Sequence, residues 1–269
     1  MLSIVIVNFK NPALLRLCLK SLHRVLTPLF EREIIVIDVA SDIKTRNVVS
    51  EEFPSVRLIP FEENIGFTRG VNEGIKSSHG DYVLLLNSDL VPLSNAIESM
   101  YQYMREDPKI GILGPKLLNF DSTNQDACFR FISPMTIIYR RTFLGKLPFG
   151  KKHLDYFFMN DKDKTEPLEA DWLFGSPIMI NREAINKVGF MDERFFLYLS
   201  DVDWPRRFWQ NGYKVIFFPR AQMYHYHVRH SKGQYGILDV IFKKESRWHL
   251  IDAIKYFLKY PPKLFHVPK

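Results

Sequence analysis

Two aspartates in this sequence stand where the chemistry of group transfer needs carboxylates. Asp89 follows a strongly apolar run that ends in Asn87 and Ser88, and Asp201 begins a predicted helix after an aromatic run. A diphosphate leaving group develops negative charge, which a divalent cation or basic groups must neutralise. Asp89 is placed to hold such a cation, because Mg²⁺ and Mn²⁺ keep several waters and take further ligands from phosphates. Asp201 is placed to act as a general base that deprotonates an attacking hydroxyl.

These polar groups also have simpler interpretations. A strand-end aspartate more often caps a turn, which is the alternative for Asp89. Ser200 is a good helix N-cap with Asp203 three residues further on, so these two predict a local capping arrangement. His225 is a candidate metal ligand, because a neutral imidazole binds metals. His225 and His227 alternate along a predicted extended segment, so at most one of them reaches the site.

The elements that must position these groups alternate between strands and helices. Apolar, β-branched runs predict buried parallel strands, and helical spacing of apolar residues predicts the helices between them. The predicted strands cover 3–9, 33–39, 56–60, 81–86, 110–117 and 213–218, and the predicted helices cover 12–25, 44–53, 94–105 and 182–188. This order predicts an α/β layered domain with a mostly parallel sheet. Ligands bind beyond the carboxyl ends of such strands, where Asp38 and Asp89 fall.

Three segments fall outside this simple alternation. Residues 64–78 are punctuated by glycines, and residues 119–167 mix aromatic and basic residues without a period. We expect 119–167 to form loops and short helices that cover the active face. The last 30 or so residues have helical spacing, with Lys255 and Lys259 turned away from an apolar face made of Trp248, Ile251, Ile254 and Leu258.

The charge of the chain is concentrated in this C-terminal segment. The formal net charge is +7, and residues 229–269 contain nine Lys and Arg against three Asp and Glu, which gives +6. A basic, aromatic tail can rest on an anionic membrane surface or bind polyphosphate. The alternative is a helix that packs on its own domain with a solvated basic face. Nucleic acid is disfavoured as a partner, because no RNP, zinc-finger or similar signature accompanies the charge.

The composition of the chain limits the classes of protein to which it can belong. With 269 residues, 46% hydrophobic and 25% charged, the chain has ordinary globular composition and can bury a large core. Cys18 and Cys128 lie far apart and outside any CxxC pattern, so neither a disulfide framework nor a structural zinc site is predicted. The apolar run from Leu2 to Phe9 is too short for a signal sequence or a membrane-spanning helix. We therefore expect a cytoplasmic protein.

Several sequence blocks recur in the order found in one family. They are SIVIVN (3–8), IIVIDVAS (34–41), ENIGFTRGVNEGI (63–75), LLLNSD (84–89), DWLFGSP (171–177), SDVDW (200–204) and PRAQMYH (219–225). With these blocks the chain resembles the bacterial family-2 glycosyltransferases of the GT-A fold, particularly the rhamnosyltransferase-like group, over roughly residues 3 to 231. The resemblance implies a GT-A type, Rossmann-like layered domain with a C-terminal helical extension.

The resemblance also implies a role for each matched residue. Asp201 is the catalytic base, and Asp89 and His225, rather than His227 or His230, are the ligands of Mn²⁺ or Mg²⁺. Asp38 bonds a pyrimidine base, while Arg69 reaches the diphosphate of the donor. The acceptor cleft is lined by Trp172, Gly175 and Ser176. The full set of donor-binding residues is Asn8, Asp38, Ser41, Asn64, Gly66, Arg69, Gly70, Asn87 and Ser88.

Three residues depart from the family pattern. Val39 replaces an Asn and Ser88 replaces a Pro, but the neighbouring Asp38 and Asp89 remain. Ser200 replaces the Glu before the base, so a group that would orient or tune the base is missing. We therefore expect lower activity or an unusual acceptor. The family's closing Ser is matched by Ser231.

The function implied is inverting transfer of a sugar, rhamnose in this group, from a dTDP- or UDP-linked donor. The acceptor would be a glycan or lipid-linked hydroxyl in cell-surface polysaccharide synthesis. Residues 1–231 would form the transferase domain, with a nucleotide-sugar half (1–118) and an acceptor half (119–231). Residues 232–269 would form a basic amphipathic tail on the inner face of the membrane.

Three other functions are weighed against this one. A non-catalytic sugar-nucleotide-binding subunit of a polysaccharide assembly complex is favoured by Ser200 in place of Glu. A nucleotidyltransferase would need a basic phosphate-binding loop after the first strand, where only Lys10 occurs. A dehydrogenase is disfavoured, because no GxGxxG follows the first strand.

Overall fold

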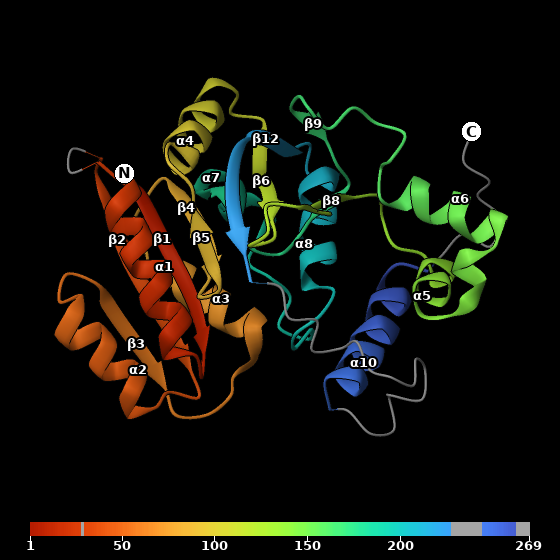
Figure 1. Ribbon diagram of the computed structural model, residues 1–269. Coiled ribbons are helices and arrows are strands. Elements are labelled where there is room, and N and C mark those ends of the chain that lie inside the picture. Colours follow the sequence, from red (N-terminus) through yellow and green to blue (C-terminus); the bar gives the residue numbers. More distant parts are fainter. Residues whose placement is uncertain (28–29, 227–243, 262–269) are drawn as a thin grey trace.

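The predicted α/β layered architecture is confirmed in the computed structural model, which describes residues 1–27, 30–226 and 244–261 and, within the last range, the side chains from 247 onward. Figure 1 shows a twisted central sheet, with the helices α5 (Pro134–Arg141), α6 (Pro148–Phe157) and α10 (Lys244–Lys259) grouped at one side of it. None of the described helices combines the length and apolar character needed to span a bilayer.

The sheet is mostly parallel, as predicted. Its central path follows the order β3 (Arg57–Phe61), β2 (Arg32–Val39), β1 (Leu2–Phe9), β4 (Tyr82–Asn87), β11 (Ile178–Asn181), β6 (Ile110–Leu118), β12 (Lys214–His225) and β5 (Leu90–Pro92). Only β11 and β5 run antiparallel to their neighbours on this path. Two short strands, β7 (Asn124–Gln125) and β9 (Leu168–Glu169), pair with β6 and β12, and β8 (Cys128–Phe129) pairs separately with β10 (Trp172–Leu173).

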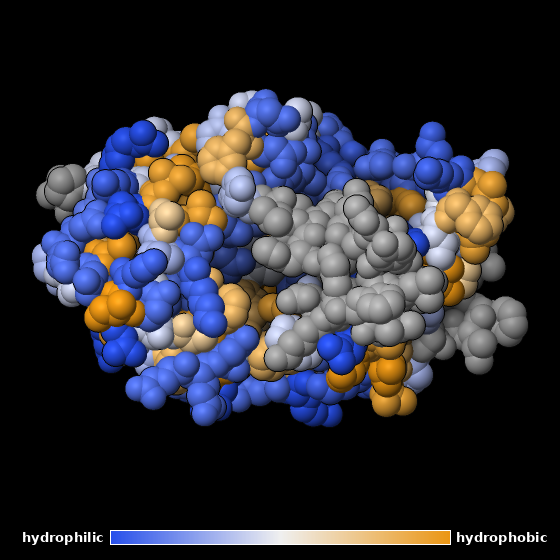
Figure 2. All heavy atoms as spheres, turned by 60° about the horizontal axis from the view of Figure 1, so that its bottom comes forward, coloured by the Kyte–Doolittle hydropathy of each residue, from blue (hydrophilic) through white to orange (hydrophobic). Residues whose placement is uncertain are grey.

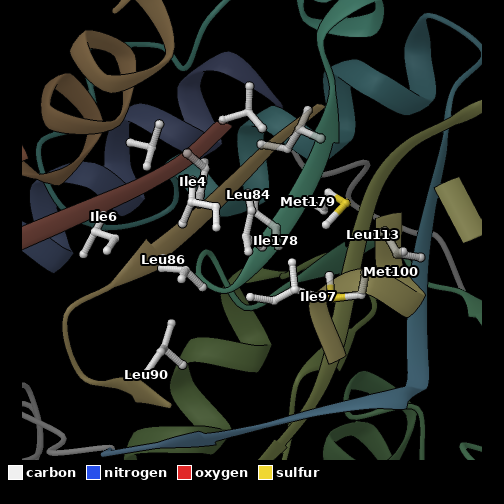
Figure 3. Close-up of a cluster of buried hydrophobic side chains, with 14 of the residues drawn as sticks. Ile4, Ile6, Leu84, Leu86, Leu90, Ile97, Met100, Leu113, Ile178 and Met179 are labelled. Atoms are coloured by element: carbon white, nitrogen blue, oxygen red, sulfur yellow. The ribbon is translucent and has the colours of Figure 1, made fainter. Parts of the chain in front are cut away.

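The two faces of the sheet bury alternate residues of the same strands. On one face, Ile4 of β1 lies in a cluster with Ile97 and Met100 of α4 (Ala96–Glu106) (Figure 3). On the other face, Val5 packs against Gly74 of α3 (Gly66–Lys76), where an added Cβ would overlap the valine side chain. The helices therefore cover both faces, which explains why these strands are apolar throughout.

The remaining helices begin where local chemistry favours it. In α1 (Pro12–Val25) the side chain of Asn11 accepts a hydrogen bond from Leu14 N at 3.1 Å, and Pro12 occupies the first turn. The predicted helix 44–53 is divided into α2 (Ile43–Asn47) and a π-helical turn, η1 (Val48–Glu52). The glycine-punctuated segment forms α3, and α7 (Arg182–Val188) and α8 (Ser200–Gln210) complete the main domain.

The segment 119–167 forms short elements, as expected from its sequence. These are β7, β8, α5, a 3₁₀ turn η2 (Phe143–Lys146), and α6. Ser133 caps α5 through a reciprocal capping box with Thr136. The predicted strand 213–218 is longer than expected, because β12 continues to His225 and pairs with β5.

The C-terminal helix α10 is packed on the domain, which is one of the two alternatives considered for the basic C-terminal segment. Ala253 and Tyr256 are buried in a second hydrophobic cluster with residues of α5, α6 and α8, whereas Ile251, Ile254 and Leu258 are exposed. Ile251, Ile254 and Leu258 of the predicted apolar face are therefore turned away from the domain, whereas Lys259 of the predicted basic face binds Asp192 and Asp203. Helical spacing identifies residues that share a face and leaves open which face meets the domain.

Candidate active site

The first part of the site is a buried polar pair at the carboxyl ends of β1 and β2. The strands pair Asn8 with Asp38, and Asn8 Nδ2 donates to Asp38 Oδ1 at 2.8 Å. Both side chains are fully buried, and burial raises the pKa of Asp38. Within the described part of the chain, Asn8 Oδ1 and Asp38 Oδ2 have no hydrogen-bond partner. Two unsatisfied buried acceptors are costly, so this pair suits a ligand that brings an N–H donor.

The second part is a carboxylate and an imidazole brought together by strand pairing. Asp89 lies between β4 and β5, and β12 runs antiparallel to β5 with His225 opposite Leu90. Asp89 Oδ2 is consequently 3.7 Å from His225 Nε2. Asp89 Oδ1 has no hydrogen-bond partner among the residues that the structure covers. The structure thus brings the two candidate metal ligands together, and their binding of a metal stays a prediction.

Gln125 of β7 orients the imidazole, a role that sequence reasoning missed. Its Nε2 donates to Asn119 Oδ1 at 2.6 Å and to the carbonyl of His225 at 2.9 Å, so its Oε1 is the atom that faces His225 Nδ1 at 2.8 Å. An amide oxygen only accepts, so Nδ1 is the donor and the lone pair of the neutral ring is on Nε2. Nε2 is the nitrogen that faces Asp89.

This donor set fits a divalent cation bound in part by substrate. In residues 1–27, 30–226 and 244–261 no group of three His, Cys, Asp or Glu side chains could hold a metal ion. Asp89 supplies a carboxylate oxygen without a hydrogen bond, and His225 supplies an oriented nitrogen. Mn²⁺ accepts such mixed oxygen and nitrogen ligands, and Mg²⁺ is commonly held by one or two carboxylates plus substrate phosphates.

The third part is Asp201, in the first turn of α8. An added Cβ on Gly175 would lie 2.8 Å from Asp201 Cβ, so the Asp201 side chain packs directly on this glycine. Burial raises the pKa of Asp201 to about 6, although hydrogen bonds from the backbone of Gly175 and Leu199 and the charge of Arg140 act in the opposite direction. A carboxylate with this pKa is ionised at neutral pH and is more basic than an ordinary aspartate, which suits a general base.

A short chain of contacts connects the second and third parts. The ring of Phe174 lies 5.3 Å from that of His225, centroid to centroid, and the next residue, Gly175, contacts Asp201. Residues 174–175 therefore connect Asp201 with the Asp89 and His225 pair. These contacts favour the prediction that both carboxylates face one cleft.

The glycine-rich loop before α3 makes contacts different from those predicted for it. Asn64 Oδ1 accepts from Gly66 N at 3.0 Å, and Gly66 has a φ of +79° with its Cα against Phe196, where any side chain would collide. Gly70 faces Val7 and Val39, so its small size lets α3 approach the sheet. Arg69 is exposed on the first turns of α3. Donor binding by these residues stays a prediction.

The remaining predicted donor residues lie at the same sheet edge. Ser41 follows β2, and its hydroxyl accepts from Arg46 Nε at 3.1 Å. Asn87 ends β4 and pairs with Val7 of β1, and the backbone N–H of Ser88 donates to the carbonyl of Val7 at 3.2 Å. Their backbones are thus next to the Asn8 and Asp38 pair.

Two of the predicted acceptor residues are more buried than a cleft lining requires. Trp172 stacks on Phe129 at 4.3 Å and donates from Nε1 to the carbonyl of Arg130 at 2.9 Å, deep in the second hydrophobic cluster. Ser176 Oγ donates to the carbonyl of Leu85 at 3.4 Å, and its side chain is also buried. These positions favour roles in packing, and Gly175 is the one of the three that contacts Asp201.

The predicted cap at the start of α8 is wrong. Leu199 is the N-cap, with a left-handed φ of 62° and no side-chain cap, and Ser200 Oγ has no hydrogen-bond partner in the described chain. Asp203, fully buried, instead binds Arg207 Nε at 2.9 Å and Lys259 Nζ at 2.6 Å. The interpretation of Asp203 as structural agrees with these contacts, which come from Arg207 in the same helix and from Lys259 of the C-terminal helix.

The C-terminal helix also holds the loop that leads to Asp201, which the sequence did not indicate. The buried carboxylate of Asp252 accepts hydrogen bonds from the backbone N–H groups of Phe196, Leu197 and Tyr198 at 3.4, 3.2 and 3.0 Å. This loop continues through Leu199 into α8. The carbonyl of Phe196 accepts from Phe67 N at 3.1 Å, so the same loop also contacts the start of α3. His227, His230 and Ser231, considered above, lie outside the described residues.

The fold is that of a GT-A glycosyltransferase. Residues 3–189 match the family model described as "Glycosyl transferase family 2", so the chain belongs to this family. The solved structure of GalNAc-T7 with UDP, GalNAc and Mn²⁺ is similar with a TM-score of 0.63 at 18% identity, over 87% of this chain and 46% of that chain. This likeness shows the shared fold.

Curated relatives agree with the family. The chain is 27% identical over 214 residues to an N-acetylglucosaminyl-diphospho-decaprenol L-rhamnosyltransferase of Mycobacterium tuberculosis, covering 75% of this chain and 68% of the relative. It is 26% identical to the low-salt glycan biosynthesis hexosyltransferase Agl10 of Haloferax volcanii, covering 75% of this chain and 59% of that relative. The chain thus spans about two thirds or less of the length of these proteins. The resemblance to rhamnosyltransferase-like family-2 enzymes is confirmed.

Proposed function

We propose that this protein is an inverting glycosyltransferase that acts by a single displacement. Asp201 accepts the proton of an acceptor hydroxyl, the hydroxyl oxygen attacks the anomeric carbon, and the bond from that carbon to the nucleoside diphosphate breaks. Attack opposite the leaving group inverts the configuration. The observation that carries this proposal is the half-buried carboxylate of Asp201, whose pKa is raised to about 6 and which is connected to the Asp89 and His225 pair through the contacts of Phe174 and Gly175.

The donor is proposed to be a pyrimidine nucleoside diphosphate sugar. The unsatisfied acceptors Asn8 Oδ1 and Asp38 Oδ2 match the imide N–H that uracil and thymine both carry. This pair serves dTDP- and UDP-linked sugars equally. Rhamnose is proposed as the sugar, because a relative at 27% identity is named as an L-rhamnosyltransferase.

Asp89 and His225 would hold Mn²⁺ or Mg²⁺. Such a cation, when bound, neutralises the charge that develops on the diphosphate leaving group. The chain's own contribution is geometric, since Gln125 orients His225 and strand pairing sets Asp89 beside it. Binding both substrates in one cleft also removes much of the entropy of encounter, which is worth roughly 7 to 11 kcal/mol in well-oriented reactions.

The acceptor is proposed to be a glycan or lipid-linked hydroxyl used in cell-surface polysaccharide synthesis. This follows from the names of the relatives, which act on a diphospho-decaprenol lipid in one case and in glycan biosynthesis in another. We place the reaction at the cytoplasmic face of a membrane, where both a nucleotide sugar and a lipid-linked acceptor are accessible.

The test is Asp201→Asn in the full chain, with Asp163→Asn as the matched control on an exposed loop whose carboxylate only bonds Thr165. Asp201→Asn should abolish transfer and leave donor-induced thermal stabilisation intact, measured with dTDP- and UDP-sugars and Mn²⁺. Retained turnover would refute the assignment of the base. A wild-type chain that binds donor but neither transfers the sugar nor hydrolyses the donor would favour the non-catalytic binding subunit.

A further inference from the structure

The outward face of α10 is apolar, which is unusual for a helix at the surface of a domain. Leu250, Ile251, Ile254 and Leu258 are all exposed, with Leu258 at 78% and Ile254 at 52%. Asp252, in contrast, is turned inward and buried. A soluble surface helix normally has the reverse arrangement. Exposed apolar residues that share one helix face indicate an interaction surface.

The adjoining segment α5–η2–α6 adds a second group of exposed apolar side chains. Phe143 is 72% exposed and Phe149 is 56% exposed, and Met135, Ile138 and Leu147 are exposed as well. Figure 2 shows hydrophobic side chains at the surface on the right of the view, the side on which Figure 1 places α5, α6 and α10. We define the docking surface as the exposed apolar residues of these two segments.

Packing holds the two segments of the docking surface together. Tyr256 of α10 lies in the same buried cluster as Phe157 of α6, and Ile137 of α5 packs against that cluster. His249 of α10 has its pKa lowered to about 4, by burial first and then by the charges of Arg141 and Arg140. The apolar helix face and the α5–η2–α6 segment therefore belong to one structural unit.

The charge around the docking surface is strongly positive. Residues 134–157 contain five basic residues, Arg140, Arg141, Lys146, Lys151 and Lys152, against one acidic residue, Asp155. All of these basic residues except Arg141 are exposed, and so is Arg247 of α10. Aliphatic and aromatic side chains mixed with Lys and Arg are typical of helices that lie in the interface of an anionic bilayer.

We propose that the docking surface formed by α10 and α5–η2–α6 binds an anionic lipid bilayer. A second copy of the chain is a poorer occupant, because a two-fold contact would bring the same positive patches together. The proposal rests on the proposed function in one respect, since a lipid-linked acceptor lies in such a bilayer. The surface also leads to the base, because Arg140 of α5 is close enough for its charge to act on Asp201.

The experiment measures sedimentation of the full chain with vesicles of phosphatidylglycerol and phosphatidylcholine, and with phosphatidylcholine alone. The variant Ile254→Ser with Leu258→Ser should reduce partition to anionic vesicles by about 100-fold. Each side chain contributes about tenfold if insertion into the bilayer yields about half of the free energy of fully burying it. The matched control is Leu17→Ser with Ile43→Ser, two exposed apolar residues of α1 and α2, which should bind as wild type does.

A second variant tests the charge. Lys151→Gln with Lys152→Gln should lose about 25-fold, because each basic residue near an anionic surface contributes about fivefold. Lys20→Gln, at a side chain 63% exposed on α1, is its control. Binding should weaken as salt rises.

Several outcomes would overturn the proposal. They are equal binding of wild type and the Ile254 and Leu258 variant, equal binding to both kinds of vesicle, and loss of a dimer in that variant without loss of vesicle binding. Transfer to a soluble acceptor separates this inference from the proposed function. Transfer without vesicle binding refutes only the inference, and vesicle binding without transfer refutes only the function.

Discussion

The contact between Gly175 and Asp201 makes a sharp prediction for Gly175→Ala. The new Cβ would lie 2.8 Å from Asp201 Cβ, whereas ordinary contact begins at 3.4 Å, so the two atoms must separate by 3.4 − 2.8 = 0.6 Å. Asp201 Cβ is next to the backbone of α8 and cannot rotate away as the end of a flexible side chain could. A misplacement of about 1 Å can cost about 100-fold in rate, so we expect kcat to fall about 10- to 100-fold.

The assay is steady-state transfer with the donor and acceptor varied separately, together with donor binding by thermal shift. Donor affinity should change little, because Asn8 and Asp38 lie at the ends of β1 and β2, apart from Gly175. Gly212→Ala is the control, since Gly212 has a φ of +77° and nothing within 4 Å of an added Cβ. It should lose about 1 kcal/mol or more of folding stability through backbone strain and keep its kcat.

Unchanged kcat in Gly175→Ala would refute the reasoning. A fall in kcat that Gly212→Ala reproduces at equal loss of stability would also refute it, because the effect would then come from folding. Only a loss specific to Gly175 supports a base that packs on this glycine.

Three further predictions concern the groups around the site. Activity should fall as pH drops through about 6, because the pKa of Asp201 is raised from 3.8 to about 6 and a protonated carboxyl cannot accept the hydroxyl proton; an acid limb near pH 4 in the kcat profile would contradict this. Gln125→Leu should weaken Mn²⁺ binding about tenfold in calorimetry, because a group that orients a ligand typically contributes 10- to 100-fold; unchanged affinity would exclude this role. Asp252→Ala should lower kcat more than donor affinity, with partial recovery in Asp252→Asn, and a fall in Tm without a change in kcat would show a purely structural role.

The parts of the site that lie at strand ends could be predicted from sequence. The apolar runs identify β1, β2 and β4, and parallel strands bring their carboxyl ends to one edge. Asn8 and Asp38 are opposite each other for this reason. The pairing of Asp89 with His225 was reached through the family pattern, since the extension of β12 along β5 has no local signal.

The contacts made across the chain could not be predicted. Gln125 and His225 are separated by 100 positions, and Asp252 lies 54 positions from Tyr198. A glutamine or an aspartate side chain can form hydrogen bonds with many different groups, so its partner depends on tertiary packing. The cap predicted at Ser200 failed for a related reason, because the left-handed backbone at Leu199 starts the helix instead.

The contacts of α10 have a practical consequence for shortened chains. Removing this helix and the residues after it would leave Asp203 without Lys259 and Tyr260. It would also remove Asp252, whose carboxylate accepts hydrogen bonds from three backbone N–H groups of the loop before Asp201. Asp203 would keep only Arg207, and a buried charge that loses part of its pairing is costly, so such a truncation should distort the start of α8 whether or not lipid is present. The loss of activity in a chain truncated before α10 would therefore not show that membrane binding is needed for activity. Only substitutions on the outward face of the helix can separate membrane binding from catalysis.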